Sequence, residues 1–302
     1  MVRPFLVALA VILVGSAAAA KAEQSDRLQF DGLIELRAVE SELETDQGDS
    51  IDSTGFGGRA RLGVTFDLSD TTTVRAEGEA RVFTFRDENR EDLETFIGRV
   101  EVRHDVSDNV EVRAFARRYE NIPVLEAFSA DQTSIGGRVQ WEKGNDRARL
   151  TGEYREREYD TLTGGDGDGY RVAAQYNRRL GPYHWLRFDA RADRISSDNE
   201  PRRSYSRQVA RVKYSLPVAK RLRIRPSLEY RTWDYDSRIA RGDPDGALRK
   251  DSYFAPGADV AWSHPRTGIY ATASAEHRFR TSNDERFDAN AWRIGVRFGV
   301  RF

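Results

Sequence analysis

The chain has 302 residues, with 48 Lys and Arg against 49 Asp and Glu, and it contains no cysteine. A mean hydropathy of −0.68 excludes a bundle of membrane-spanning helices. The formal net charge of −1 gives no general attraction to phosphate, which argues against a nucleic-acid-binding protein.

The N-terminal segment has the three-part layout of a secretory signal peptide. Arg3 supplies a positive charge, residues 5–15 are apolar, and small residues follow from Ser16 to Ala20. The apolar run is shorter than the roughly 20 residues that span a bilayer. Ala20 and Ala22 each end an A-x-A sequence, and we favour cleavage after Ala22. The predicted division is a signal peptide over residues 1–22 and one domain over residues 23–302.

From residue 28 onward, apolar and polar residues alternate with period two. In the last segment the even positions from Trp292 to Phe302 are apolar, and Arg293, Arg297 and Arg301 lie between them. A strand separates such sets onto opposite faces, whereas a helix scatters them. The rule predicts fourteen strands, each near the nine to eleven residues that cross hydrocarbon when tilted. They are Leu28–Ala38, Phe56–Leu68, Val74–Val82, Phe96–His104, Val110–Arg118, Thr133–Trp141, Arg147–Arg157, Tyr170–Arg178, Leu186–Asp193, Arg207–Leu216, Leu222–Arg231, Tyr253–Trp262, Ile269–Phe279 and Ala291–Phe302.

The predicted connections alternate between long loops and short turns. Long polar loops such as Val39–Gly55 and Trp233–Ser252 are followed by tight turns such as Ser69–Thr72 and Ser263–Thr267. Long loops at one rim and short turns at the other are typical of transmembrane barrels. A soluble sandwich needs no such alternation. Aromatic residues also gather near predicted strand ends, as at a membrane interface: Trp141, Tyr154, Tyr170, Tyr176, Trp185, Tyr214, Tyr230, Trp262 and Trp292.

Together these features resemble a porin-like bacterial outer-membrane β-barrel protein. The resemblance implies an all-β, antiparallel, up-and-down barrel in the Gram-negative outer membrane, with periplasmic turns and extracellular loops. It implies lipid and lipopolysaccharide as surroundings, and a monomer is the expected state. The C-terminal pattern is similar to the signal that the barrel-assembly machinery reads, which implies that machinery as a partner. The residues that carry this signal are Trp292, Ile294, Val296, Phe298, Val300 and Phe302.

If the apolar faces meet lipid, the opposite faces line a lumen that is rich in arginine. We predict that the lumen arginines form the selectivity surface for an anionic solute: Arg59, Arg61, Arg75, Arg81, Arg99, Arg103, Arg113, Arg149, Arg155, Arg187, Arg191, Arg211, Arg223, Arg225, Arg293 and Arg297. The same faces carry Arg117, Arg157, Arg207, Lys213 and Arg301. Interleaved glutamates, such as Glu101 and Glu229, could instead pair with the arginines and only rigidify the wall.

The long loops hold an acidic excess, which includes Asp46, Asp49, Asp243, Asp245 and Asp251. The loop Tyr119–Gln132 is the most apolar of the loops. We therefore expect it to fold into the barrel and to narrow the lumen.

Catalysis, metal binding and cofactors find little support in the sequence. His277 lies on an apolar face, but the His-x-Ser spacing of outer-membrane lipid hydrolases is absent, because Arg278 and Phe279 follow it. A single glycine-aspartate run over residues 164–169 is weak support for a calcium site. We predict a non-enzymatic channel without cofactor or metal that passes small polar, preferably anionic solutes, with acidic sugars as one candidate class. The alternatives are a barrel for the export or assembly of surface proteins or polysaccharide, and a closed structural barrel.

Overall fold

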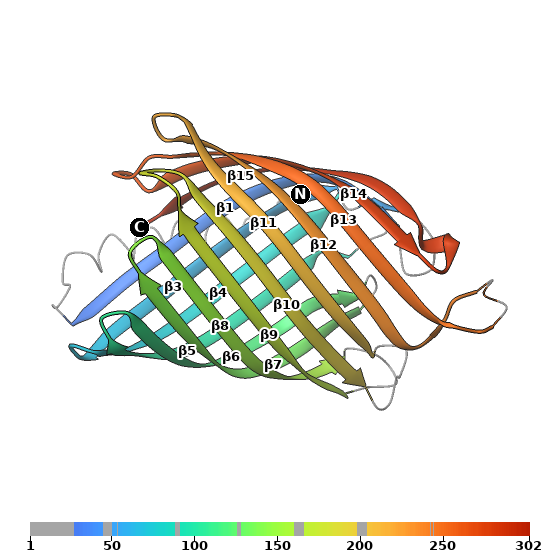
Figure 1. The fold of residues 1–302 in the computed structure, drawn as a ribbon, viewed down its shortest axis with the longest axis horizontal. Helices are drawn as coiled ribbons and strands as arrows, with labels where there is room; N and C mark the ends of the chain where they lie inside the picture. The colour runs from blue at the N-terminus through green and yellow to red at the C-terminus, as the bar shows by residue number, and fades with distance from the viewer. Residues whose placement is uncertain are drawn as a thin grey trace.

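The computed structural model describes residues 27–44, 50–52, 54–87, 91–125, 128–159, 166–197, 204–241, 243 and 245–302. The predicted signal peptide lies outside these residues. Consecutive long strands pair antiparallel, and the last strand pairs with the first, which closes a barrel of fourteen strands (Figure 1). The predicted all-β, up-and-down antiparallel barrel is therefore confirmed. No described helix is long and apolar enough to span a membrane.

The wall consists of β1 and β3 to β15, and the short β2 pairs only with the end of β1. The elements are β1 Leu28–Glu44, β2 Ser50–Asp52, β3 Gly55–Ser69, β4 Thr72–Phe85, β5 Leu93–Ser107, β6 Val110–Leu125, β7 Phe128–Lys143, β8 Asp146–Tyr159, β9 Asp166–Arg179, β10 Trp185–Ser197, β11 Tyr205–Ala219, β12 Leu222–Ile239, β13 Leu248–Ser263, β14 Ile269–Ser282, the 3₁₀ turn η2 Glu285–Phe287 and β15 Ala289–Arg301.

The two rims of the barrel differ in the length of their connections. One rim, the turn end, has the connections 70–71, 108–109, 144–145, 180–184, 220–221 and 264–268. The other rim, the loop end, has the connections 45–54, 86–92, 126–127, 160–165, 198–204, 240–247 and 283–288. The predicted alternation is confirmed except at 126–127, which is as short as a turn, and several strands run farther toward the loop end than predicted. Beyond a membrane both faces of a hairpin meet water, so hydrogen-bonded pairing continues where the apolar alternation has stopped.

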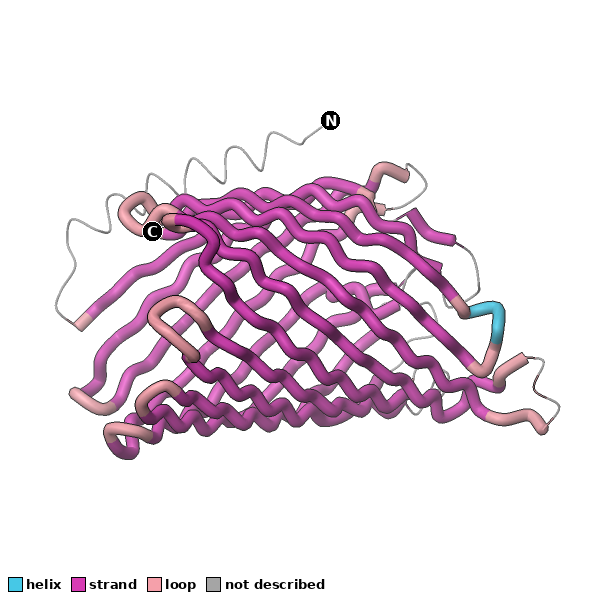
Figure 2. Tube along the Cα trace, turned by 45° about the horizontal axis from the view of Figure 1, so that its top comes forward, coloured by secondary structure: helices cyan, strands magenta, loops and turns pink. Residues whose placement is uncertain are grey.

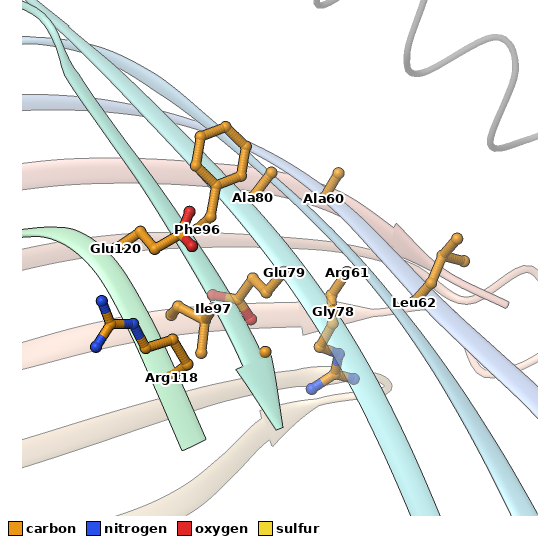
Figure 3. Close-up of a pocket in the computed structure, with 11 residues that line it drawn as sticks. Ala60, Arg61, Leu62, Gly78, Glu79, Ala80, Phe96, Ile97, Arg118 and Glu120 are labelled. Atoms are coloured by element: carbon orange, nitrogen blue, oxygen red, sulfur yellow. The ribbon is translucent and has the colours of Figure 1, made fainter. Parts of the chain in front are cut away.

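Burial in this barrel is the reverse of burial in a soluble protein. Phe56 is 72% exposed and Leu36 is 62% exposed, whereas Glu101 and Asp193 are 4% and 3% exposed. Figure 3 shows the alternation directly, because Phe96 and Ile97 leave β5 on opposite sides. Apolar side chains facing outward and charged side chains facing inward fit a barrel surrounded by lipid around a polar lumen.

The outer wall has a shallow hollow of about 450 Å³ over β3 to β6 (Figure 3). It forms where Ala60, Gly78 and Gly98 leave little or no side chain between larger neighbours such as Phe96. These residues share the outward face, so the hollow is a feature of the lipid-facing surface and lies on the opposite side of the wall from the lumen.

The barrel closes where β15 meets β1. Phe302 and Gly32 exchange backbone hydrogen bonds of 2.8 and 3.1 Å between their amides and carbonyls. The Phe302 ring lies over Gly32, in the space where a Cβ atom would be. Glycine at position 32 therefore allows the C-terminal residue to seat against the first strand.

Candidate functional site: the arginine-rich lumen

Strand register places all the arginines predicted for the lumen on the inward face. Arg59 and Arg81 are direct cross-strand partners on β3 and β4, and Arg113 on β6 lies opposite Arg103 on β5. The alternation of exposure along each strand agrees with this face. The period-two rule thus located the lumen correctly. The arginines divide, however, into those that contact carboxylates and those that do not.

A first network joins β1, β3 and β4. Arg75 binds Asp31 through an Nη1–Oδ2 contact of 2.5 Å and donates a hydrogen bond of 2.9 Å to Glu77. Arg61 lies 3.7 Å from Asp31 and 3.8 Å from Glu77. Each carboxylate is therefore shared by two guanidinium groups. The shared contacts hold three neighbouring strands in one register.

A second network occupies β5 and β6. Arg113 donates to Glu101 at 2.6 Å and to Glu111 at 2.5 Å, and Arg103 contacts Glu111 at 2.9 Å. Arg99 also pairs with Glu101. Such ladders match the alternative prediction, in which interleaved glutamates stiffen the wall.

A third network surrounds the buried carboxylate of Asp193 on β10. Arg207, Arg191, Arg155 and Arg171 approach its carboxylate to 2.9, 3.2, 3.6 and 3.8 Å. The side chains of Arg155 and Asp193 are fully buried, at 0% exposure each. Four guanidinium groups around one carboxylate leave an excess of positive charge. We call this set of five residues the Asp193 cluster.

A contrasting set of arginines lies at the closing seam. Arg37 on β1 is directly opposite Arg297 on β15, and Arg293 lies four residues farther along β15 on the same face. Among the described residues, these three form no ion pair and no side-chain hydrogen bond with a carboxylate. We call Arg37, Arg293 and Arg297 the seam arginines. Arg149 and Arg223 likewise have no carboxylate partner in the described part of the chain, and Arg149 instead donates to Gln140 and Gln175.

Many inward guanidinium groups still reach the interior space. The side chains of Arg187, Arg211 and Arg103 are 40%, 41% and 42% exposed although they point away from the outer wall. Arg293 and Arg297 are exposed as well. This exposure means that the lumen beside these arginines is not filled by other side chains, so a hydrated solute has access to them.

The expected constriction by Tyr119–Gln132 is wrong. This segment continues the β6–β7 ladder, with Tyr119 paired to Gln132 and Leu125 paired to Phe128. Backbone pairing satisfies its polar groups as part of the wall, which a loop folded into the lumen would not achieve. The apolar character that suggested an inward loop belongs instead to a hairpin.

Among the described connections, the short 3₁₀ turn η2 lies between β14 and β15 at the loop end (Figure 2), and Phe287 in it packs against the inner face of the wall. Phe287 is only 4% exposed. Its ring centroid lies 3.3 Å from Cζ of Arg249 and 5.7 Å from Cζ of Arg280, two arginines on the inward faces of β13 and β14. Cation–π contacts therefore hold this turn against the inside of the wall at the loop end.

Asp284 fixes the same turn at its start. It accepts hydrogen bonds from Arg286, at 2.5 Å from Nη2, and from the Arg241 backbone amide at 2.9 Å, which ties the turn to the β12–β13 connection. The Arg286 hydrogen bond is the main reason that the pKa of Asp284 lies far below its usual range, and the Arg241 amide lowers it further. The carboxylate is thus charged at neutral pH.

Sequence reasoning left some lumen residues unnamed. Arg138, Arg171 and Arg231 face inward, and the period-two rule would have found them within the predicted strands. Asp251 was assigned to an acidic loop, but it lies on β13 with 2% exposure and binds Arg249 at 2.7 Å and Arg280 at 2.6 Å. Trp185 was expected at the interface, but it shares the inward face of β10 with Arg187.

Residues considered for other chemistry lie apart from the lumen. His277 faces outward, with its ring 4.3 Å from Phe279 and 4.6 Å from Trp292 between centroids. In the glycine-aspartate run, residues from Asp166 onward belong to β9. No group of potential metal ligands occurs among the described residues.

No family model and no curated protein matches the sequence significantly. Solved structures do match. OmpT of Vibrio cholerae aligns with a TM-score of 0.55 and 11% identity over 92% of this chain and 99% of that one. The chain has a porin-like outer-membrane β-barrel fold. The anion-selective porin from Comamonas acidovorans aligns with a TM-score of 0.53 and 11% identity over 91% and 99% of the two chains. The outer membrane channel DcaP of Acinetobacter baumannii aligns with a TM-score of 0.55 and 11% identity over 91% and 97%.

Proposed function

We propose that the chain is a channel of the bacterial outer membrane that passes small polar solutes and prefers anions. The lumen arginines act as its selectivity surface, and the channel has no catalytic activity. Its turn end faces the periplasm and its loop end faces the outside. The barrel-assembly machinery inserts it through the C-terminal pattern from Trp292 to Phe302.

The observation that carries this proposal is the unequal charge of the inward faces. On the inward faces of the described strands, basic side chains outnumber carboxylates, so one carboxylate can serve several arginines, as Asp193 does. Arginines such as Arg187 and Arg211 keep 40% and 41% of their side chains exposed inside the barrel. Charge on low-dielectric walls focuses the field and raises the local concentration of the opposite ion.

Single-channel recording of the refolded chain tests this proposal. We expect open steps and a reversal potential under a KCl gradient that indicates anion selectivity. Charge reversal at Arg99, Arg113 and Arg211 should move the reversal potential toward cation selectivity. Arg178→Glu is the matched control, because Arg178 lies on the outward face of β9. A cation-selective wild-type pore would refute the anion preference.

A closed structural barrel is the second candidate, and one observation favours it. The pairs Arg155 with Asp193 and Arg249 with Asp251 are almost fully buried at the loop end. A folded barrel that stays silent in the bilayer would support this role and refute the channel.

A further inference from the structure

The seam arginines have an arrangement that costs folding free energy. Arg37 and Arg297 are directly opposite on paired strands, and like charges in such positions repel. Arg293, Arg81 and Arg59 also repel Arg37, and Glu35 on the same strand offsets part of this repulsion. Elsewhere in the lumen such repulsion is relieved by a shared carboxylate, as for Arg103 and Arg113, which both contact Glu111.

The nearby carboxylates are already engaged with other groups. Glu35 accepts a 2.5 Å hydrogen bond from Tyr270 and lies 3.5 Å from Arg59. Glu276 accepts a 2.8 Å hydrogen bond from Arg278. Within the described residues, the seam arginines therefore keep their full hydrogen-bonding capacity for a group outside the chain.

Arg37 is nevertheless held in a defined position. Its Cζ lies 4.9 Å from the ring centroid of Phe83, which is 7% exposed. Gly57 leaves the space through which the Arg37 side chain passes, because a Cβ atom at position 57 would lie 2.8 Å from its Nε. An aromatic ring and a glycine thus orient this guanidinium without neutralising it. On β15, Gly295 lies between Arg293 and Arg297 on the inward face, and the atom nearest to the place of its missing Cβ is Ser274 Oγ at 3.3 Å.

We infer that the seam arginines form a binding site for an elongated polyanion that carries carboxylate or phosphate groups, such as a short acidic oligosaccharide. Arg37 passes over Gly57 toward Phe83 on β4, whereas Arg293 and Arg297 lie on β15, so the three guanidinium groups offer separate contact points for the anionic groups of one molecule. The Cα atoms of Arg293 and Arg297 are four residues apart, about 13 Å at the usual rise per strand residue. This inference names the substrate class of the proposed channel and rests on that function.

Block of the chloride current by added anions tests the site in the refolded full-length chain. The probes are inorganic phosphate, which is compact, and trigalacturonate, which is elongated. Arg37→Gln, Arg293→Gln and Arg297→Gln should each weaken the block by trigalacturonate about tenfold, as expected for a lost charge-assisted hydrogen bond. Each should change the block by phosphate less, within about threefold, because a compact anion does not reach all three guanidinium groups at once.

The matched control is Arg178→Gln, which removes an arginine on the outward face of β9, outside the lumen. Block by either probe should stay within about twofold of wild type in this variant. If block of the chloride current weakened equally in the control and in the seam variants, the proposed binding site would be overturned. Trigalacturonate block that does not depend on Arg293 would overturn the elongated substrate.

Thermal unfolding separates failure of the site from failure of the channel. Trigalacturonate should raise the Tm of the wild-type barrel but not that of Arg297→Gln, because a ligand that binds only the folded state stabilises it. A silent barrel that shows this difference would refute the channel and keep the site. A conducting barrel that shows no ligand-dependent shift and unchanged block in the variants would refute the site and keep the channel.

Discussion

The Asp193 cluster and the seam arginines place the same side chain in two opposite situations. Around Asp193, four guanidinium groups converge on one buried carboxylate and bring β8, β9, β10 and β11 together. At the seam, Arg37 and Arg297 occupy paired positions, form no ion pair with a carboxylate of the described residues, and remain accessible from the lumen. The first arrangement stabilises the wall at the expense of access. The second keeps binding capacity at the expense of stability. Changes at the two places should therefore affect stability with opposite signs.

The largest change in the free energy of unfolding should come from Asp193→Asn. The change leaves four guanidinium groups without their shared counter-charge, and we expect a loss of about 3 kcal/mol in the free energy of unfolding. Urea unfolding followed by tryptophan fluorescence measures it. Asp189→Asn is the control, because the Asp189 side chain is 28% exposed, and it should lose less than about 1 kcal/mol. Equal losses would mean that burial of the carboxylate does not matter.

Arg155→Met should lower the free energy of unfolding less than Asp193→Asn does, although the side chains of Arg155 and Asp193 are both fully buried. Nε and Nη1 of Arg155 have no hydrogen-bond partner among the residues that the structure describes, and three other arginines still contact Asp193. We expect a loss of about 1 kcal/mol in the same unfolding measurement. A loss as large as that of Asp193→Asn would show that Arg155 is the main partner of the carboxylate.

Arg297→Gln should raise the free energy of unfolding by about 0.5 kcal/mol, because it removes a like charge opposite Arg37. The same variant should weaken polyanion block. A stability gain combined with a binding loss is the signature expected of a ligand site. A lower free energy of unfolding in this variant would contradict the expectation that the Asp193 cluster and the seam arginines affect stability with opposite signs.

The smallest expected change in stability is a pH-dependent one, and it comes from Asp284 in the turn before β15. The pKa of Asp284 is lowered in the folded chain, mainly by the hydrogen bond from Arg286. Its contribution to stability is therefore fully present above the unfolded pKa of about 3.9 and is lost as pH falls through the lower folded value. The difference in unfolding free energy between wild type and Asp284→Asn should be constant from neutral pH to about pH 5 and should shrink below about pH 4. A difference that grows on acidification would contradict this assignment.

Alternation along the sequence predicted the barrel, its strand count and the inward arginines, because each strand meets lipid on one face and water on the other. It could not predict which arginine meets which carboxylate. Arg75 contacts Asp31 across an intervening strand, and Arg207 contacts Asp193 fourteen residues away, so these pairs depend on register. The packing of the η2 turn against the wall was also missed. Phe287 is anchored by Arg249, which is remote in the sequence, and a single phenylalanine in a polar connection gives no local signal.

The reversed burial of this barrel also limits how its gene can vary. Odd and even positions of a strand face different solvents, so substitutions on one set can alter the lumen while the other set keeps the membrane contact. Insertion of one residue in mid-strand would move every following arginine into lipid and every following apolar residue into the lumen, up to the next connection. Length changes inside strands should therefore survive only in pairs of residues, whereas single insertions should collect in the loops.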